Sequence, residues 1–114
     1  MEALIERLKE KLNVWFLNRN INKYKEYITK LGSCVKAYEE TVNEGYVGKL
    51  EKRIEKLEKS IGKLVKICLK IEEDSRKRLS NLNNVLYQDT YKEMLEELKK
   101  KEVAIIHQFL KYKR

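Results

Sequence analysis

The chain has 114 residues, of which 26 are Lys or Arg and 18 are Asp or Glu, so its formal net charge is +8. It contains 4 Gly and no Pro, a composition that leaves helices unbroken and lacks the turn residues of a β-sandwich or barrel. One His and two Cys give little material for acid–base, nucleophilic or metal chemistry, so we expect no enzyme, no metal site and no cofactor. These counts predict a single all-α domain over residues 1–114, built as an elongated antiparallel helical bundle.

The first helical segment carries two apolar stripes that lie on different sides of a helix. The first stripe comprises Ile5, Leu8, Leu12 and Trp15. The second stripe comprises Val14, Leu17, Ile21, Tyr24, Ile28 and Leu31. Three Asn follow Trp15 within a few residues, and each amide can bond the backbone locally instead of supporting the helix. We therefore expect a kink or a change of packing partner near Asn18 to Asn22.

The next segment contains the signals of a helix end and a loop. Gly32 suits a helix C-terminus, and Ser33 can cap a new helix. The short helix expected there would present on one face Val35, Tyr38 and Val42. The segment Asn43 to Gly48 contains two Gly and is predicted to be the main loop.

The most regular pattern is a heptad repeat in the middle of the chain. Apolar residues recur there at spacings of 4, 3, 4, 3, 4 and 3, and this apolar seam comprises Leu50, Ile54, Leu57, Ile61, Leu64, Cys68 and Ile71. Such a seam faces another helix along its whole length. Because neither Gly nor Pro follows Ile71, one long heptad-patterned helix is expected over about 49–87.

A C-terminal helix is predicted to begin at Thr90. Thr90 and Glu93 have the spacing of a capping box, in which the hydroxyl caps a free N–H and the carboxylate reaches back. The apolar face of this helix, expected over about 90–113, comprises Tyr91, Leu95, Leu98, Ile105, Phe109 and Tyr112. Glu102 occupies the one position of that face that is not apolar.

Lysines recur on the side of the long helix opposite the seam. This lysine stripe comprises Lys52, Lys56, Lys59, Lys63, Lys66 and Lys70. The six ammonium groups would extend over roughly 27 Å, a length comparable with a run of duplex phosphates. Lys63 and Lys66 have no acid three or four residues away, so the middle of the stripe is the least neutralised. The alternative interpretation is a merely solvated helix face.

A candidate anion site lies at the start of the long helix. The run from Gly45 to Lys49 is not a phosphate-binding P-loop, because the glycine spacing, the Ser or Thr after the Lys and the preceding strand are all missing. The free N–H groups of a helix that begins near Lys49 could still bind a phosphate or carboxylate beside Gly48 and Lys49. The alternative is an ordinary turn.

Five further residues are candidates for a functional role. Trp15 and Phe16 are adjacent and point about 100° apart on a helix. One narrow seam cannot hold both, so they are candidate partner-binding residues, with burial of both in a wide core as the alternative. His107 lies in an apolar run and is interpreted as a packing or rim residue. Cys34 and Cys68 are too few for a disulfide framework and are interpreted as small buried groups.

Two functions follow from these features. The first is a non-catalytic module that binds nucleic acid or a nucleoprotein complex through phosphates contacted by the lysine stripe. The alternative is a protein-interaction, assembly or inhibitor module that acts through its coiled-coil-like seam and exposed aromatic residues. The seam also favours a homodimer, because a chain of this length can only partly cover such a long helix.

The sequence also predicts a cytoplasmic location. Its longest apolar runs, 14–17 and 103–106, are far shorter than the roughly 20 residues of a membrane span. Glu2, Glu6 and Glu10 interrupt the region where a signal peptide would be hydrophobic. We therefore expect no membrane partner and a reducing compartment. A chain rich in Lys, Asn, Ile and Tyr is also compatible with a virus- or mobile-element-encoded protein inside its host.

Overall fold

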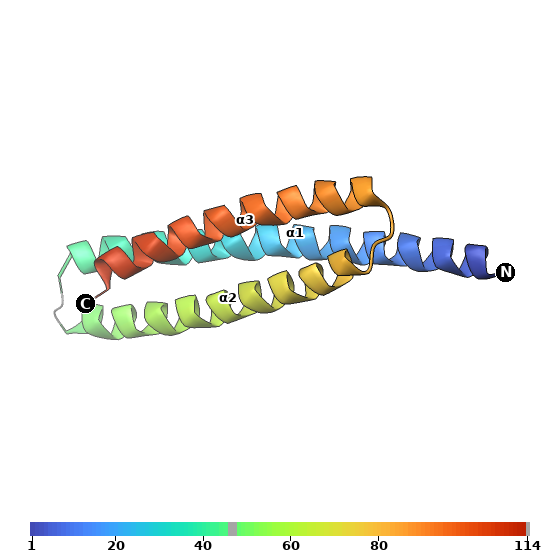
Figure 1. Ribbon diagram of the computed structural model, residues 1–114. Helices are drawn as coiled ribbons and strands as arrows, with labels where there is room; N and C mark the ends of the chain where they lie inside the picture. Colours follow the sequence, from blue (N-terminus) through green and yellow to red (C-terminus); the bar gives the residue numbers. More distant parts are fainter. Residues whose placement is uncertain (46–47, 114) are drawn as a thin grey trace.

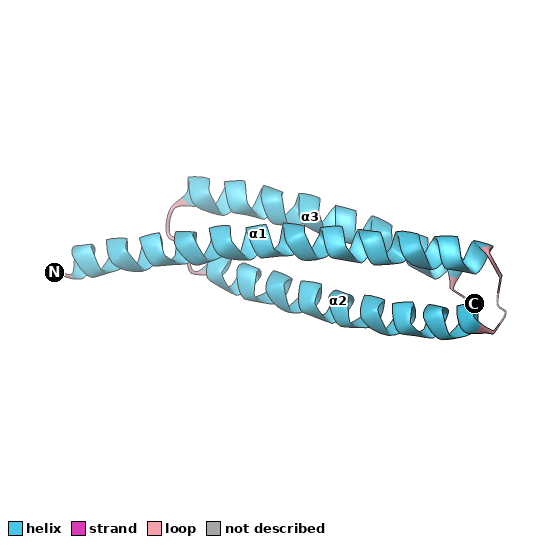
Figure 2. Ribbon diagram, turned by 180° about the vertical axis from the view of Figure 1, so that it is seen from behind, coloured by secondary structure: helices cyan, strands magenta, loops and turns pink. Residues whose placement is uncertain are grey.

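The protein is a bundle of three long helices. The computed structural model describes residues 1–45 and 48–113, with the side chain of Lys49 left out. Within these residues the helices are α1 (Glu2–Asn43), α2 (Lys49–Ser80) and α3 (Val85–Tyr112), and no strand is present. The bundle measures 67 × 19 × 16 Å, and α1 packs against both other helices except at its N-terminal turns, which project beyond them (Figures 1 and 2). The predicted all-α, elongated antiparallel bundle is confirmed.

Helix α1 continues without a break through Gly32 and Ser33, so the helix end and the short separate helix predicted there are wrong. Leu31 and Val35 are both buried on the same face, and this burial outweighs the cost of about 1 kcal/mol of a glycine inside a helix. A Cβ at Gly32 would lie 3.5 Å from Cδ1 of Ile105. This is an ordinary van der Waals distance, so Gly32 faces α3 but the space there does not require a glycine.

The helix also runs through the Asn-rich segment. Asn18 uses its amide oxygen to accept a hydrogen bond from the Tyr91 hydroxyl of α3, at 2.8 Å. A change in packing does occur, but between Trp15, which is exposed, and Leu17, which is fully buried. The two apolar stripes of α1 thus have different environments, and only the second one lies in the core.

Helices α2 and α3 meet at a turn that lies earlier than predicted. Helix α2 ends at Ser80, and Asn84 caps α3 by accepting hydrogen bonds from two backbone N–H groups, those of Leu86 and Tyr87. Leu82 of the turn is inserted into the core. The predicted bounds 49–87 and 90–113 are therefore wrong at this junction.

The predicted capping box at Thr90 does not form. Thr90 lies inside α3, and its hydroxyl donates to the carbonyl of Leu86 at 2.8 Å instead of capping a helix. The segment Asn81–Asn84 offers a better cap, and the carboxylate of Glu10 in α1 accepts hydrogen bonds from the N–H groups of Asn83 and Asn84. This contact with α1 is not visible in the local sequence.

The apolar seam faces the inside of the bundle. Its Ile54, Ile61 and Cys68 are almost fully buried, and its other members are half-buried at the edges of the helix contacts. The seam therefore packs against α1 of the same chain, as a heptad pattern predicts. One core cluster lies toward the α2–α3 turn and another toward the opposite end, and Ile105 packs against both.

Candidate functional site: a lysine-lined helix face

The lysine stripe lies on the outer face of α2. All six side chains are exposed. None of them forms an ion pair in the part of the chain that the structure describes. The cations of the ion pairs there are Lys9, Lys30, Arg76 and Lys99. Because the seam on the opposite side of α2 is buried against α1, the helix presents these ammonium groups from one rigid support (Figure 1).

Two acidic residues of α2 are turned toward the interior of the bundle. Oε1 of Glu58 accepts a hydrogen bond from the Tyr38 hydroxyl of α1 at 3.0 Å. Glu72 is buried and pairs with Arg76 at 3.1 Å and with Lys99 of α3 at 3.0 Å. The Glu72 carboxylate is therefore withheld from the outer face, whereas Glu58 lies with Glu55 in the lining of a groove that borders Lys59.

An open groove of about 590 Å³ borders the stripe between α2 and α3. Lys59 and Lys66 of the stripe line one side, and Lys113 from the end of α3 lines the groove as well. The floor is apolar and includes Ile61 and Phe109. The stripe is therefore joined by a cation from a second helix.

The candidate anion site is described only in part. Helix α2 begins at Lys49 as predicted, and Gly48 has a positive φ of 53°, which a glycine adopts without strain. The carbonyl of Gly48 accepts the N–H of Glu51 at 3.2 Å. Tyr46, Val47 and the Lys49 side chain lie outside the described residues, so the prediction of an anion site stays a prediction.

Trp15 and Phe16 have different environments. Trp15 is 55% exposed, with the guanidinium of Arg19 5.7 Å from its ring centroid. Phe16 is half-buried, and the guanidinium of Arg78 from α2 lies 3.9 Å from its ring centroid. Joint burial in a wide core is therefore wrong. Trp15 remains a candidate for partner binding, whereas Phe16 already contacts α2.

A buried polar network at the centre of the bundle was not predicted. Glu102 is 1% exposed and accepts hydrogen bonds from the Tyr24 hydroxyl at 2.8 Å and from Lys99 at 3.3 Å. Lys99 also pairs with Glu72, so the network joins all three helices. The only sequence signal was the single charged position in the apolar face of α3. This network is a structural crosslink, because its polar atoms bond to one another across α1, α2 and α3.

The network changes the pKa values of its members. Burial raises the pKa of Tyr24, and the hydrogen bond to Glu102 raises it further. Burial also raises the pKa of the nearby Cys68 thiol, to about 11. For Lys99, burial lowers the pKa, but the carboxylates of Glu72 and Glu102 outweigh it and the net shift is upward.

Stability is expected to fall at alkaline pH. An unfolded chain loses protons from Cys, Tyr and Lys near their ordinary pKa values of 9.0, 10.0 and 10.5, whereas the folded chain keeps them on Cys68, Tyr24 and Lys99 to higher pH. The unfolded state then binds fewer protons, so the free energy of unfolding decreases from about pH 9 upward. Urea unfolding at a series of pH values measures this, and a free energy that stays constant from neutral pH to about 11 would contradict it.

The remaining sequence candidates do not assemble into a reactive site. His107 is exposed, Cys34 is half-buried and Cys68 is buried, and both thiols are free. His107 is therefore a rim residue, which is one of the two predicted roles, and not a buried packing residue, and Cys34 is only partly covered. Within the described residues no group of three His, Cys, Asp or Glu could bind a metal ion.

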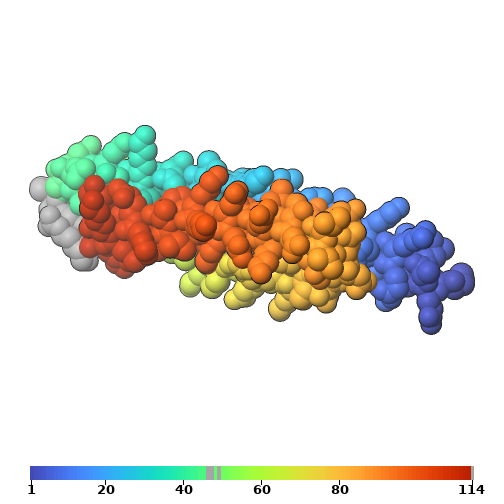
Figure 3. Space-filling model, turned by 45° about the horizontal axis from the view of Figure 1, so that its top comes forward, coloured from blue at the N-terminus to red at the C-terminus, as the bar shows by residue number. Residues whose placement is uncertain are grey.

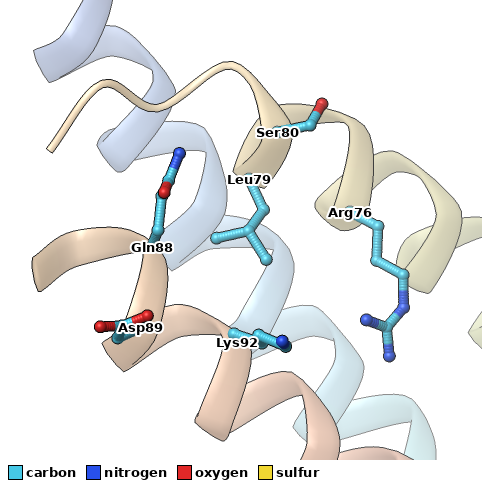
Figure 4. Close-up of a pocket in the computed structure, with 6 residues that line it drawn as sticks. All are labelled: Arg76, Leu79, Ser80, Gln88, Asp89 and Lys92. Atoms are coloured by element: carbon cyan, nitrogen blue, oxygen red, sulfur yellow. The ribbon is translucent and has the colours of Figure 1, made fainter. Parts of the chain in front are cut away.

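A small pocket lies at the α2–α3 corner (Figure 4). It is lined by Arg76, Leu79, Ser80, Gln88, Asp89 and Lys92. The Ser80 hydroxyl donates to the backbone carbonyl of Lys77, and the Gln88 amide donates to that of Leu82. Both polar groups therefore stabilise the turn, and the lining contains no paired nucleophile and base.

Comparison of the chain with known protein families, with curated proteins and with solved structures found no significant match. No helix in the described residues is long and apolar enough to span a bilayer.

Proposed function

We propose that this protein is a non-catalytic module that binds a polyanion, a nucleic acid or a nucleoprotein complex, through the lysine stripe of α2. The observation that supports this proposal is the row of six exposed lysines without an ion pair on one helix face. Exposed lysines elsewhere on a protein are usually scattered, whereas this row follows one straight element over roughly 27 Å.

The mode of binding follows from the chemistry of lysine. An ammonium group is a point charge on a flexible stem, so it contacts phosphate oxygens but does not read base edges with a fixed geometry. Each phosphate that a lysine neutralises releases a condensed counterion, and this release drives the association. Binding should therefore be sensitive to salt and nearly indifferent to sequence. Two free thiols and the absence of a disulfide among the described residues are consistent with a role in a reducing compartment such as the cytoplasm.

Removal of the central charges should weaken binding strongly. Changing Lys59, Lys63 and Lys66 together to Gln keeps a good helix former at each position, so the fold should persist. Loss of three phosphate contacts is expected to reduce affinity for duplex DNA on the order of a hundredfold near physiological salt, equally for unrelated sequences. Fluorescence anisotropy with labelled duplexes measures this change.

A matched variant separates the stripe from net charge. Lys92, Lys100 and Lys101 of α3 are also exposed, and changing them to Gln removes the same three charges from positions scattered around the helix. This control should lose several-fold less affinity than the stripe variant. Equal losses would show that only net charge matters, and no loss in either variant would leave the stripe a solvated surface.

Protein binding is the second candidate function, and one observation favours it. The seam packs inside the bundle, so it is not accessible to a partner in this conformation. Exposed apolar residues do gather at the N-terminal end of α1, and they include Trp15.

A further inference from the structure

The first turns of α1 project beyond the rest of the bundle and carry an uncovered apolar face (Figure 3). We define the N-terminal arm as residues 1–15. Its arm stripe comprises Met1, Leu4, Ile5, Leu8, Leu12 and Trp15. Each of these side chains is between 48% and 97% exposed. Five large apolar groups and one tryptophan on one short helix exceed the isolated exposed residues of an ordinary surface.

The arm stripe points away from α2 and α3. Glu10 faces the α2–α3 turn, because its carboxylate accepts hydrogen bonds from Asn83 and Asn84. At 100° per residue, Leu8 and Leu12 lie on the opposite side of the helix from Glu10. A second helix can therefore approach Ile5 and Leu8 without meeting α2 or α3, whereas Leu12 borders a pocket that Asn81 and Asn83 of the turn also line.

We propose that the arm stripe pairs with the arm of a second copy of this chain, in an antiparallel arrangement. The stripe has heptad spacing, in which apolar residues alternate between positions a and d of the seven-residue repeat. In an antiparallel pair, each residue at position a lies opposite a residue at position d of the other helix. One register sets Ile5 opposite Leu8 of the second copy and Leu12 opposite its Met1. Symmetry repeats each contact, so four apolar layers form, and the two bundles extend in opposite directions without collision.

Charge favours this register over the others. It brings Glu2 beside Lys9 of the second copy, twice by symmetry, since both flank the seam on the same side, and Lys9 then adds this contact to the exposed pair that it forms with Glu6 of its own chain at 3.9 Å. Another antiparallel register pairs Ile5 of one copy with Trp15 of the other. It places the two copies of Lys9 beside each other, and likewise the two copies of Lys11, so that like charges meet. A parallel pair would place Arg19 of one copy against Arg19 of the other, because position 19 follows Trp15 in the heptad spacing. Only the proposed register places an acid opposite a base.

The apolar area that the two arms can bury against each other determines the strength of the dimer. Half-exposed side chains of this size would bury on the order of 500 Å² of apolar surface per chain, or about 1,000 Å² in total. Stable complexes bury about 1,200–2,000 Å², so this interface falls below that range and should dissociate readily on dilution. A dimer formed through the arm therefore differs from the seam-mediated dimer that the heptads suggested.

Sedimentation velocity across a dilution series tests the pairing. The wild-type protein should change reversibly from dimer to monomer, whereas Leu8→Glu should remain monomeric at every concentration. The matched control is Leu110→Glu, because Leu110 of α3 is 55% exposed and Leu8 is 58% exposed. This control should dimerise like the wild type. A wild-type monomer throughout, or a dimer that survives Leu8→Glu, would overturn the proposal.

A charge exchange tests the register. Lys9→Glu alone should weaken the dimer about fivefold to tenfold, because it replaces two attractive contacts by two repulsive ones. Adding Glu2→Lys in the same chain restores both pairs in reversed form, and the dimer constant should return to within about twofold of the wild-type value. Failure of the double variant to recover would overturn the antiparallel register. Neither charge belongs to the lysine stripe, so DNA binding by these variants reports separately on the proposed function.

Discussion

Replacing Ile61 by Asp is expected to unfold the protein. Ile61 is 1% exposed and lies in the core cluster between α2 and its neighbours. A carboxylate buried there without a partner costs several kcal/mol, which is comparable with the whole stability of a small domain, about 5–15 kcal/mol. Far-ultraviolet circular dichroism and thermal melting should show loss of helix and of a cooperative transition.

Two further substitutions calibrate this result. Leu57 and Leu64 are half-buried members of the same seam, and Asp at either position should destabilise the protein less, because the carboxylate can reach water. Ile67 lies on the same helix but is 37% exposed, and Ile67→Asp should keep a melting temperature near that of the wild type. An Ile61→Asp variant with wild-type helicity and melting temperature would show that the seam does not face the core.

Replacing Lys99 by Met should cost about 2–3 kcal/mol of stability. The substitution keeps an unbranched apolar stem but removes the cation that lies 3.0 Å from Glu72 and 3.3 Å from Glu102. Breaking a buried ion pair from one side costs about 3–5 kcal/mol, and partial exposure of Lys99 reduces this value. Chemical denaturation measures the change.

The neighbouring Lys100 provides the control for this change. It is exposed and forms no ion pair in the described residues, so Lys100→Met should change stability by less than about 0.5 kcal/mol. Adding Glu102→Gln to Lys99→Met removes one of the two stranded carboxylates and should recover part of the loss. If Lys99→Met and Lys100→Met have equal effects, the network contributes no stability.

The helical class and the inward seam could be predicted because they depend on local composition and spacing. No Pro and an apolar residue every three or four positions predict an amphipathic helix, whose apolar face is buried along α2 but exposed in the arm stripe. The helix ends could not be predicted in the same way. Gly32 stays helical because its neighbours are buried, and α3 begins at Val85 because Glu10 binds the turn before it. Both reasons are tertiary contacts.

The candidate site likewise has features that follow from local spacing and features that depend on tertiary contacts. The outward position of the lysine stripe follows from the helix period, so it could be derived from spacing alone. The groove that borders Lys59 and Lys66 depends on how α3 is placed beside α2, which no spacing encodes. Glu102 was visible as an exception in an apolar face, but its partners Tyr24 and Glu72 come from two other helices.

The salt dependence of duplex DNA binding tests the central proposal most directly. If four to six lysines of the stripe contact phosphates, a plot of log affinity against log salt should have a slope of about −3 to −5, and the slope should shrink by roughly three in the variant with Gln at 59, 63 and 66. A flat plot for the wild-type protein, or an unchanged slope in the variant, would contradict a phosphate-binding role for this face.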